Sequence, residues 1–291
     1  MNILETIFLG IVQGVAEFLP VSSSGHLAIF KNIFGLSEVG LTYDVLLHLG
    51  TLLAVFVVFW KDIKKLIING VMIIAECFIN LVYFFNNIFS KNNKKTYKKI
   101  LSSDYRRFVV LIIVSTIPTG IIGYLMADIV ESVSAGLLIP GIGLLITGVL
   151  LLISDMLPDG FKKADNATWG NAIVIGVVQG IATLPGISRS GSTITAALFC
   201  KFDRKFAVKY SFIMSIPAIL GASLLELKDM GSEKLSGSQW GLYILGMAVA
   251  AVVGYVCIKT MLVIVRKKKF KYFAFYCFLA GTFAIIGNFI F

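Results

Sequence analysis

The sequence is poor in charged residues and in histidine, and it has few cysteines. Only 14% of the 291 residues are Asp, Glu, Lys or Arg, whereas 57% are hydrophobic, and the mean hydropathy is +0.89. Soluble globular domains carry about 25% charged residues. The shortage of charge therefore excludes an ordinary soluble enzyme, and apolar runs of about 20 residues predict a polytopic membrane protein.

The cysteines exclude two further classes of protein. Cys77, Cys200, Cys257 and Cys277 stand alone in apolar sequence, without CxxC spacing or a companion histidine. We therefore expect neither a disulfide framework nor a zinc site.

The positive charge is distributed in a way that indicates topology. The net charge is +10, but most Lys and Arg gather in five connectors between apolar segments: 61–65, 91–107, 162–163, 201–209 and 266–271. The other connectors, 31–42, 128–134 and 228–238, hold three between them. Cytoplasmic loops of membrane proteins are enriched in Lys and Arg. We therefore assign the five basic connectors to the cytoplasm and expect no nucleic-acid partner.

The apolar runs predict six membrane spans and two broken segments. The spans lie near residues 43–60, 107–127, 135–153, 210–227, 240–264 and 272–291. Two further segments, 3–30 and 170–198, are interrupted by Pro, Gly and clustered Ser. If the basic connectors share one side, each broken segment must enter and leave on the same face. The sequence thus predicts an all-α protein with about six transmembrane helices and two re-entrant helical hairpins, and residues 66–89 must fail to cross.

The two broken segments resemble each other, which indicates an internal repeat. Residues 10–20 (GIVQGVAEFLP) align with 176–185 (GVVQGIATLP), and each continues into a Ser-rich turn that ends in Gly. Each hairpin precedes three spans, and an odd number of spans turns the second copy upside down. The two hairpin tips would then meet near the bilayer midplane around a polar site.

This repeat sets the expected domain organisation. We expect one membrane domain, residues 1–291. Repeat 1 covers about 1–153 with a cytoplasmic-side insertion at 61–106, and repeat 2 covers about 170–291.

Arg189 is the most informative residue in the second tip. Every other Lys or Arg lies in a polar connector or close to the end of an apolar segment. A guanidinium within hydrocarbon costs about 2.5–3.5 kcal/mol on insertion scales unless it meets an anion or water. Its planar fork of donors suits phosphate. Arg189 therefore predicts an anion site, with phosphate the best match.

The two tips hold further groups suited to phosphate chemistry. A half-helix that starts at a Ser-rich break points its first N–H groups at an anion. The candidates are Ser188, Ser190 and Thr193 in the second tip, and Gln13, Glu17, Ser23 and His26 in the first. An acid, a hydroxyl and an imidazole are the parts needed for nucleophilic or acid–base attack on phosphorus. Glu17 could instead ligate a divalent metal ion.

Each of these residues also has a structural interpretation. Arg189 could be a clamp on Glu17 and have no contact with a ligand. Ser22, Ser24 and Ser192 could serve only to satisfy backbone groups freed by the breaks. For His48, packing and a supporting role in the site stay equally open.

Two motifs in the tips resemble those of a known family. Residues 13–26 (QGVAEFLPVSSSGH) and 185–191 (PGISRSG) resemble the signature motifs of bacterial undecaprenyl-diphosphate phosphatases, the bacitracin-resistance phosphatases. The resemblance covers the whole chain in length, segment order and motif spacing. It implies hydrolysis of undecaprenyl diphosphate to undecaprenyl phosphate and inorganic phosphate, which recycles the lipid carrier for peptidoglycan synthesis. It also implies a bacterial plasma membrane, bacitracin resistance, a site open to the outer side, and a divalent cation, Mg²⁺ or Ca²⁺.

The resemblance also assigns roles to residues. It makes Glu17, Ser23, His26 and Arg189 catalytic, and it places Ser188 and Thr193 in the phosphate pocket. The family's first motif begins with Glu or Gln, and here it begins with Gln13. Because Gln can hydrogen-bond but cannot act as a base or a strong metal ligand, a two-carboxylate metal site in the first hairpin is not expected.

Two functions of different class are compatible with these residues. In the enzyme hypothesis, Ser23 attacks the terminal phosphorus while Glu17 or His26 handles the proton. A metal-activated water, or His26 itself, is the alternative nucleophile. In the rival hypothesis the protein is a transporter or flippase of the lipid phosphate, because inverted repeats with broken helices are typical of transporters. The sequence leaves a monomer and a homodimer equally open.

Overall fold

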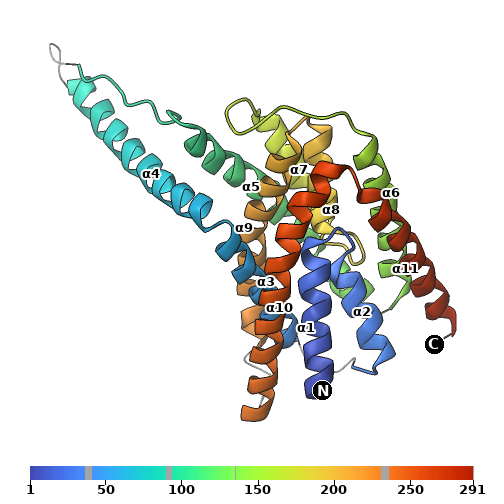
Figure 1. Ribbon diagram of the computed structural model, residues 1–291. Coiled ribbons are helices and arrows are strands. Elements are labelled where there is room, and N and C mark those ends of the chain that lie inside the picture. Colours follow the sequence, from blue (N-terminus) through green and yellow to red (C-terminus); the bar gives the residue numbers. More distant parts are fainter. Residues whose placement is uncertain (37–40, 90–93, 135, 231–235, 291) are drawn as a thin grey trace.

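The protein is a bundle of α-helices (Figure 1). The computed structural model describes residues 1–36, 41–89, 94–134, 136–230 and 236–290. The helices in this part of the chain are α1 (Ile3–Phe18), α2 (Ser23–Ile33), α3 (Leu41–Val58), α4 (Trp60–Phe89), α5 (Asp104–Ser134), α6 (Leu138–Met156), α7 (Trp169–Ile181), α8 (Arg189–Phe199), α9 (Arg204–Met230), α10 (Gly237–Ile264) and α11 (Phe270–Ile290). A short 3-10 turn, Val265–Lys267, joins the last two. No strand is found among the described residues, so the prediction of an all-α membrane protein is confirmed.

Six helices in the described part of the chain are long and apolar enough to cross a membrane. They are α4, α5, α6, α9, α10 and α11. The number agrees with the sequence prediction, but one member differs. The apolar part of α3, Thr42–Val58, falls just short of the length, whereas α4, which the charge distribution excludes, meets it. Length and apolarity alone therefore do not decide whether α4 crosses.

The two broken segments form helical hairpins whose second helices begin in the same way. Ser22 caps α2 by accepting a hydrogen bond from the Gly25 N–H at 3.3 Å, and Ser188 caps α8 by accepting one from the Gly191 N–H at 3.1 Å. A Ser side chain at this position satisfies one of the orphan N–H groups of the first turn. At 11 residues each, α2 and α8 are too short to cross a bilayer alone.

The tips of the two hairpins meet inside the bundle. The backbone N–H of Gly186 donates to Ser24 Oγ at 3.4 Å, and a Cβ added to Gly25 would lie 3.1 Å from the Gly186 Cα. Gly186 has φ +85°, and a Cβ there would overlap the carbonyl group of Pro140 on α6. Only glycine combines that backbone conformation with so close an approach. Gly186 therefore fixes the place where the second tip turns.

Each hairpin packs against a helix from the other half of the chain. α1 lies along α10, and α7 lies along α5. A Cβ at Gly14 would come 2.8 Å from the Ala250 carbonyl oxygen on α10, and one at Gly180 would come 2.7 Å from Ile122 Cβ on α5. Gly14 and Gly180 occupy matching places in the two repeated motifs. Small residues allow such close helix approach in membranes. The equivalent glycine of each repeat therefore lets its hairpin pack closely against the neighbouring helix.

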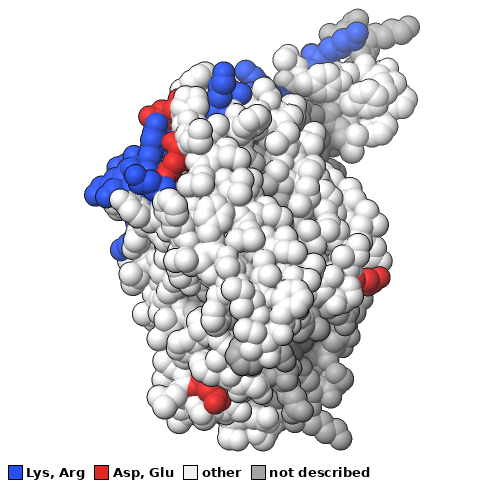
Figure 2. Space-filling view, turned by 90° about the vertical axis from the view of Figure 1, so that its right-hand side faces the viewer, with Lys and Arg blue, Asp and Glu red and all other residues white. Residues whose placement is uncertain are grey.

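Basic connectors lie together at one end of the bundle, where Figure 2 shows Lys and Arg gathered. Lys209 at the start of α9 pairs with Asp62 at the start of α4 at 2.9 Å. Arg204, also at the start of α9, bonds to Asp159 at 2.7 Å, and Lys268 approaches the same oxygen at 3.1 Å. The hydrogen bonds from Arg204 and Lys268 hold the pKa of the Asp159 carboxyl below its ordinary value. These pairs tie the connectors around 61, 159, 205 and 268 into one basic end.

Gly186→Ala tests whether the second tip depends on glycine. Gly35 provides a matched control, because it also has a positive φ, +63°, but nothing within 4 Å of its Cβ position. Gly35→Ala should cost only the conformational penalty, about 1 kcal/mol. Gly186→Ala should cost a further amount of about 1–3 kcal/mol because it also clashes with Pro140. Unfolding of the purified variants in mixed SDS micelles measures both; equal losses would contradict the account.

Candidate active site

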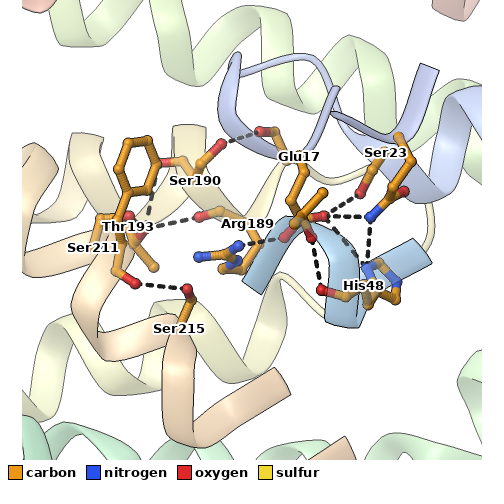
Figure 3. Close-up of polar contacts among 12 residues, drawn as sticks. Glu17, Ser23, His48, Arg189, Ser190, Thr193, Ser211 and Ser215 are labelled. Atoms are coloured by element: carbon orange, nitrogen blue, oxygen red, sulfur yellow. Dashed lines mark hydrogen bonds and ion pairs between the residues drawn. The ribbon is translucent and has the colours of Figure 1, made fainter. Parts of the chain in front are cut away.

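Glu17 lies at the centre of a cluster that joins the two hairpins (Figure 3). It is in the last turn of α1 and is 7% exposed. Its Oε1 accepts a hydrogen bond from Arg189 Nη2 on α8. Its Oε2 accepts bonds from Ser23 Oγ at 2.8 Å and from Gln13 Nε2 at 3.2 Å. The structure thus brings together four of the predicted residues, and donors on both oxygens stabilise the carboxylate as an anion.

Local sequence explains how the first hairpin builds its part of the cluster. Gln13 and Glu17 are four residues apart on α1 and so share a helix face. The chain then turns through Pro20 and through Ser22, which has φ +68°. Ser23 therefore begins α2 beside the helix that it has just left, and its hydroxyl returns to Glu17.

Arg189 is positioned by the first turn of α8. Its side chain is 16% exposed. Nη2 is bound to Glu17, but Nη1 is buried and has no hydrogen-bond partner among the described residues. Buried donors are rarely left unpaired. Arg189 thus forms the ion pair with Glu17 that the structural interpretation predicts. Its Nη1 is a further donor, to which an anion can bind.

The remaining predicted residues of the second tip form bonds that stabilise α8. Ser188 is its N-cap, and Ser190 Oγ lies 3.3 Å from Ser188 Oγ. Thr193 Oγ1 lies 2.8 Å from the Arg189 carbonyl oxygen and 2.6 Å from Ser211 Oγ on α9. In Figure 3 Thr193 and Ser211 lie beside Arg189, on the side away from Glu17. These hydroxyls hold the turn that presents the guanidinium, and direct contact with a phosphate stays a prediction.

His26 makes no hydrogen bond to Glu17 or Ser23 in the described part of the chain. Its Nδ1 lies 2.8 Å from the Ser22 carbonyl oxygen, and its Nε2 lies 2.7 Å from the hydroxyl of Tyr276 on α11. The two rings also stack, with centroids 5.4 Å apart. Both ring nitrogens are therefore engaged, and the contacts of His26 hold the first tip against α11.

The chain is similar in sequence to one family along almost its whole length. Residues 6–283 match the family described as bacitracin resistance protein BacA. The chain belongs to the BacA family.

Similar proteins carry one name. An undecaprenyl-diphosphatase of Halothermothrix orenii is 41% identical over 286 residues, which is 98% of each chain. One of Desulforapulum autotrophicum is 39% identical over the full length of both chains. A third, undecaprenyl-diphosphatase 3 of Bacillus cereus, is 36% identical over 99% of this chain and 98% of its own. The resemblance of the two motifs to this family is thereby confirmed.

His48, whose role the sequence left open, contacts the Glu17 cluster. It lies on α3, with its side chain 35% exposed and its Nδ1 3.6 Å from Glu17 Oε2. Gln13 Nε2 faces the Glu17 carboxylate, which can only accept, and it lies 2.7 Å from His48 Nδ1. Gln13 therefore donates to both. The signal was available in the sequence, because a polar ring within an apolar span is costly without a partner.

A divalent cation would find few protein ligands here. The described residues contain no group of three His, Cys, Asp or Glu that could hold a metal ion. Gln13 Oε1, however, is buried without a hydrogen-bond partner. It belongs to the same amide group whose nitrogen donates to Glu17. Mg²⁺ is commonly held by one or two carboxylates together with water and substrate phosphates. The residues thus fit a cation that shares its ligands with a diphosphate and do not form a complete protein cage.

The Glu17–Arg189 pair predicts a coupled effect on stability. Glu17→Gln leaves a buried guanidinium without its charged partner, and this should cost about 3 kcal/mol. Removing both charges, in Glu17→Gln combined with Arg189→Gln, should cost less than the sum of the two single changes. A double-mutant cycle on unfolding in mixed SDS micelles measures the coupling. Strictly additive losses would show that the two residues do not pair in the folded protein.

Proposed function

We propose that this chain hydrolyses undecaprenyl diphosphate to undecaprenyl phosphate and inorganic phosphate. The names of its relatives supply the substrate. Within the chain, the observation that carries the proposal is the Ser23–Glu17–Arg189 arrangement. A hydroxyl lies 2.8 Å from a carboxylate whose other oxygen binds a guanidinium. Hydrolysis of a phosphoric anhydride needs a nucleophile, a base and a clamp on the phosphoryl oxygens, and these three side chains have that chemistry.

Binding begins at the free donors of the two tips. Arg189 Nη1 donates to an oxygen of the terminal phosphoryl group while Nη2 keeps its bond to Glu17. The first N–H groups of α2 and α8 have no backbone acceptor within their own helices, and the tips that carry them meet at Gly186. Donors fixed in place before the substrate arrives stabilise charge on the transferred phosphoryl group without reorganisation.

The chemical step follows from the bond between Ser23 and Glu17. Glu17 Oε2 takes the Ser23 proton as Oγ bonds to the terminal phosphorus. The bond from that phosphorus to the bridging oxygen breaks, and undecaprenyl phosphate leaves with the electron pair. Glu17 passes its proton to the leaving group and then accepts one from a water that attacks the phosphoserine. Inorganic phosphate departs, and Ser23 recovers its proton.

Other predicted residues support this step. Gln13 positions Glu17 and His48 relative to each other, because its amide nitrogen hydrogen-bonds to both side chains. His26 anchors the first tip to Tyr276 and takes no part in the proton transfer. A divalent cation on Glu17 and Gln13 Oε1, Mg²⁺ or Ca²⁺, would offset the negative charge of the diphosphate.

The proposal includes a place in the cell. The protein is a multi-pass membrane protein, and we assign it to the plasma membrane with its basic end in the cytoplasm. In this proposal the site opens to the outer side of the membrane. Hydrolysis there would recycle the lipid carrier for peptidoglycan synthesis and confer bacitracin resistance.

Ser23→Ala tests the proposed nucleophile. Phosphate release from undecaprenyl diphosphate by the purified protein should fall by at least about 100-fold, while binding of the diphosphate persists. Ser24→Ala is the matched control, because its hydroxyl contacts Ser22 and Gly186 but not Glu17; it should retain most of the activity.

Two results would contradict the proposal in different ways. Nearly full turnover by Ser23→Ala would show that another group attacks phosphorus. No turnover by folded parent protein, across several divalent ions, together with uptake of the lipid phosphate into vesicles, would make the protein a transporter.

A further inference from the structure

A row of polar residues runs along one face of α4, and these residues make no hydrogen bond to the Glu17 cluster among the described residues. Asn69, Asn80 and Asn87 are spaced by 11 and 7 residues, which returns each to the same helix face. Glu76 lies on this face as well. In an apolar helix of 30 residues these groups need partners if lipid surrounds them.

The partners come from one segment, residues 94–103, which we name the strap. The Asn87 side chain accepts from the Lys95 N–H at 2.7 Å and donates to the Lys95 carbonyl oxygen at 2.9 Å. The Asn80 side chain makes the same pair of bonds to Lys98, at 2.7 and 2.8 Å. Seven helical residues rise about 10.5 Å, and three extended residues span about 10 Å. The spacings of Asn and Lys therefore match, and the strap lies antiparallel along α4.

The far end of the strap is fixed in the same way. Ser103 Oγ donates to Asn69 Oδ1 at 3.3 Å. Arg106 at the start of α5 donates to Glu76 Oε1 at 2.9 Å and to the Ile100 carbonyl oxygen at 3.0 Å. α4 and the strap thus form one unit that leaves the bundle and returns to it.

Both ends of this unit start from the basic end of the bundle. Asp62 at the beginning of α4 accepts hydrogen bonds from Tyr105 and from Lys209, both at 2.9 Å. If α4 crossed the bilayer, the strap would have to cross back beside it. An extended segment with open backbone groups and four lysines (Lys94, Lys95, Lys98 and Lys99) is excluded from hydrocarbon. The unit therefore does not cross, although α4 has the length to do so.

The opposite side of α4 is apolar and faces away from the protein. Ile67, Val71, Ile74, Phe78 and Phe85 are between 52% and 71% exposed. Only 6% of the most apolar 18-residue window of α4 is buried within the protein, and Figure 1 shows α4 leaning out of the bundle. Residues 60–107 hold ten Lys or Arg and three Asp or Glu. An exposed apolar face beside an excess of lysines is the pattern of a helix that lies in a membrane surface.

We propose that α4 and the strap form a binding surface for anionic lipid at the basic end of the protein. The apolar face of α4 enters the acyl chains of that leaflet, and the strap lysines contact its anionic headgroups. This assignment does not depend on the activity proposed above.

The depth of Ile74 tests the surface orientation. Ile74 lies midway along α4, so a crossing helix would place it at the bilayer centre. A fluorophore on Ile74→Cys, with Cys77→Ser, is reconstituted in bilayers of phosphatidylcholine and phosphatidylglycerol. A nitroxide near the glycerol end of the lipid chains should quench it about twice as strongly as one near the methyl end. Val252→Cys, midway along α10 and 68% exposed, is the matched control and should show the reverse.

Two outcomes of this measurement would overturn the proposal. Stronger quenching of the Ile74 label by the deep nitroxide would mean that α4 crosses. Quenching by neither nitroxide, with energy transfer between labelled copies, would mean that a second copy of the chain covers the apolar face.

The lysines test the choice of lipid. With the label on Ile74→Cys, spin-labelled phosphatidylglycerol should quench more strongly than spin-labelled phosphatidylcholine, by about threefold. Changing Lys95, Lys98 and Lys99 to Gln should abolish this preference. Changing Lys162 and Lys163 to Gln, at the same end but outside the unit, should leave it intact. Equal quenching by the two lipids in the parent would overturn the anionic-lipid assignment.

Discussion

The buried ion pair between Glu17 and Arg189 is the interaction on which the site and the hairpins depend. Each charge alone would be strongly disfavoured among apolar helices, and together they join two tips that come from opposite halves of the chain. The tips can break their helices there because Ser22 and Ser188 cap the half-helices that follow. The charge pair and the two caps solve one problem, which is how polar backbone can exist at membrane depth.

The same pair prepares the chemistry. Glu17 holds the Ser23 hydroxyl with one oxygen and Arg189 with the other, so the nucleophile and the phosphate clamp that we propose are positioned relative to each other before a substrate arrives. Arg189 Nη1 and Gln13 Oε1 are buried without hydrogen-bond partners among the described residues, and in our proposal they bind the diphosphate and a divalent cation. A site organised in advance in this way gains its rate from electrostatics and orientation more than from motion.

Much of this arrangement could be predicted from the sequence, because it depends on local spacing. Gln13 and Glu17 share a face by their separation of four, and Arg189 stands out as a charge amid apolar residues. The contacts of His26 and His48 could not be predicted, since Tyr276 lies 250 residues from the first of them. The charge distribution predicts that residues 66–89 do not cross, whereas the length and apolarity of α4 suit a crossing helix and a surface helix equally. The strap contacts support the surface orientation that we propose.

The most direct test of the account is to trap the covalent intermediate. Parent protein is mixed with undecaprenyl diphosphate labelled with ³²P in the terminal phosphate, quenched within a turnover by SDS at neutral pH, and digested. The account predicts label on Ser23 and none in Ser23→Ala. Label on His26, or an unlabelled protein during active turnover, would contradict the claim that Glu17 and Arg189 are arranged around a serine nucleophile.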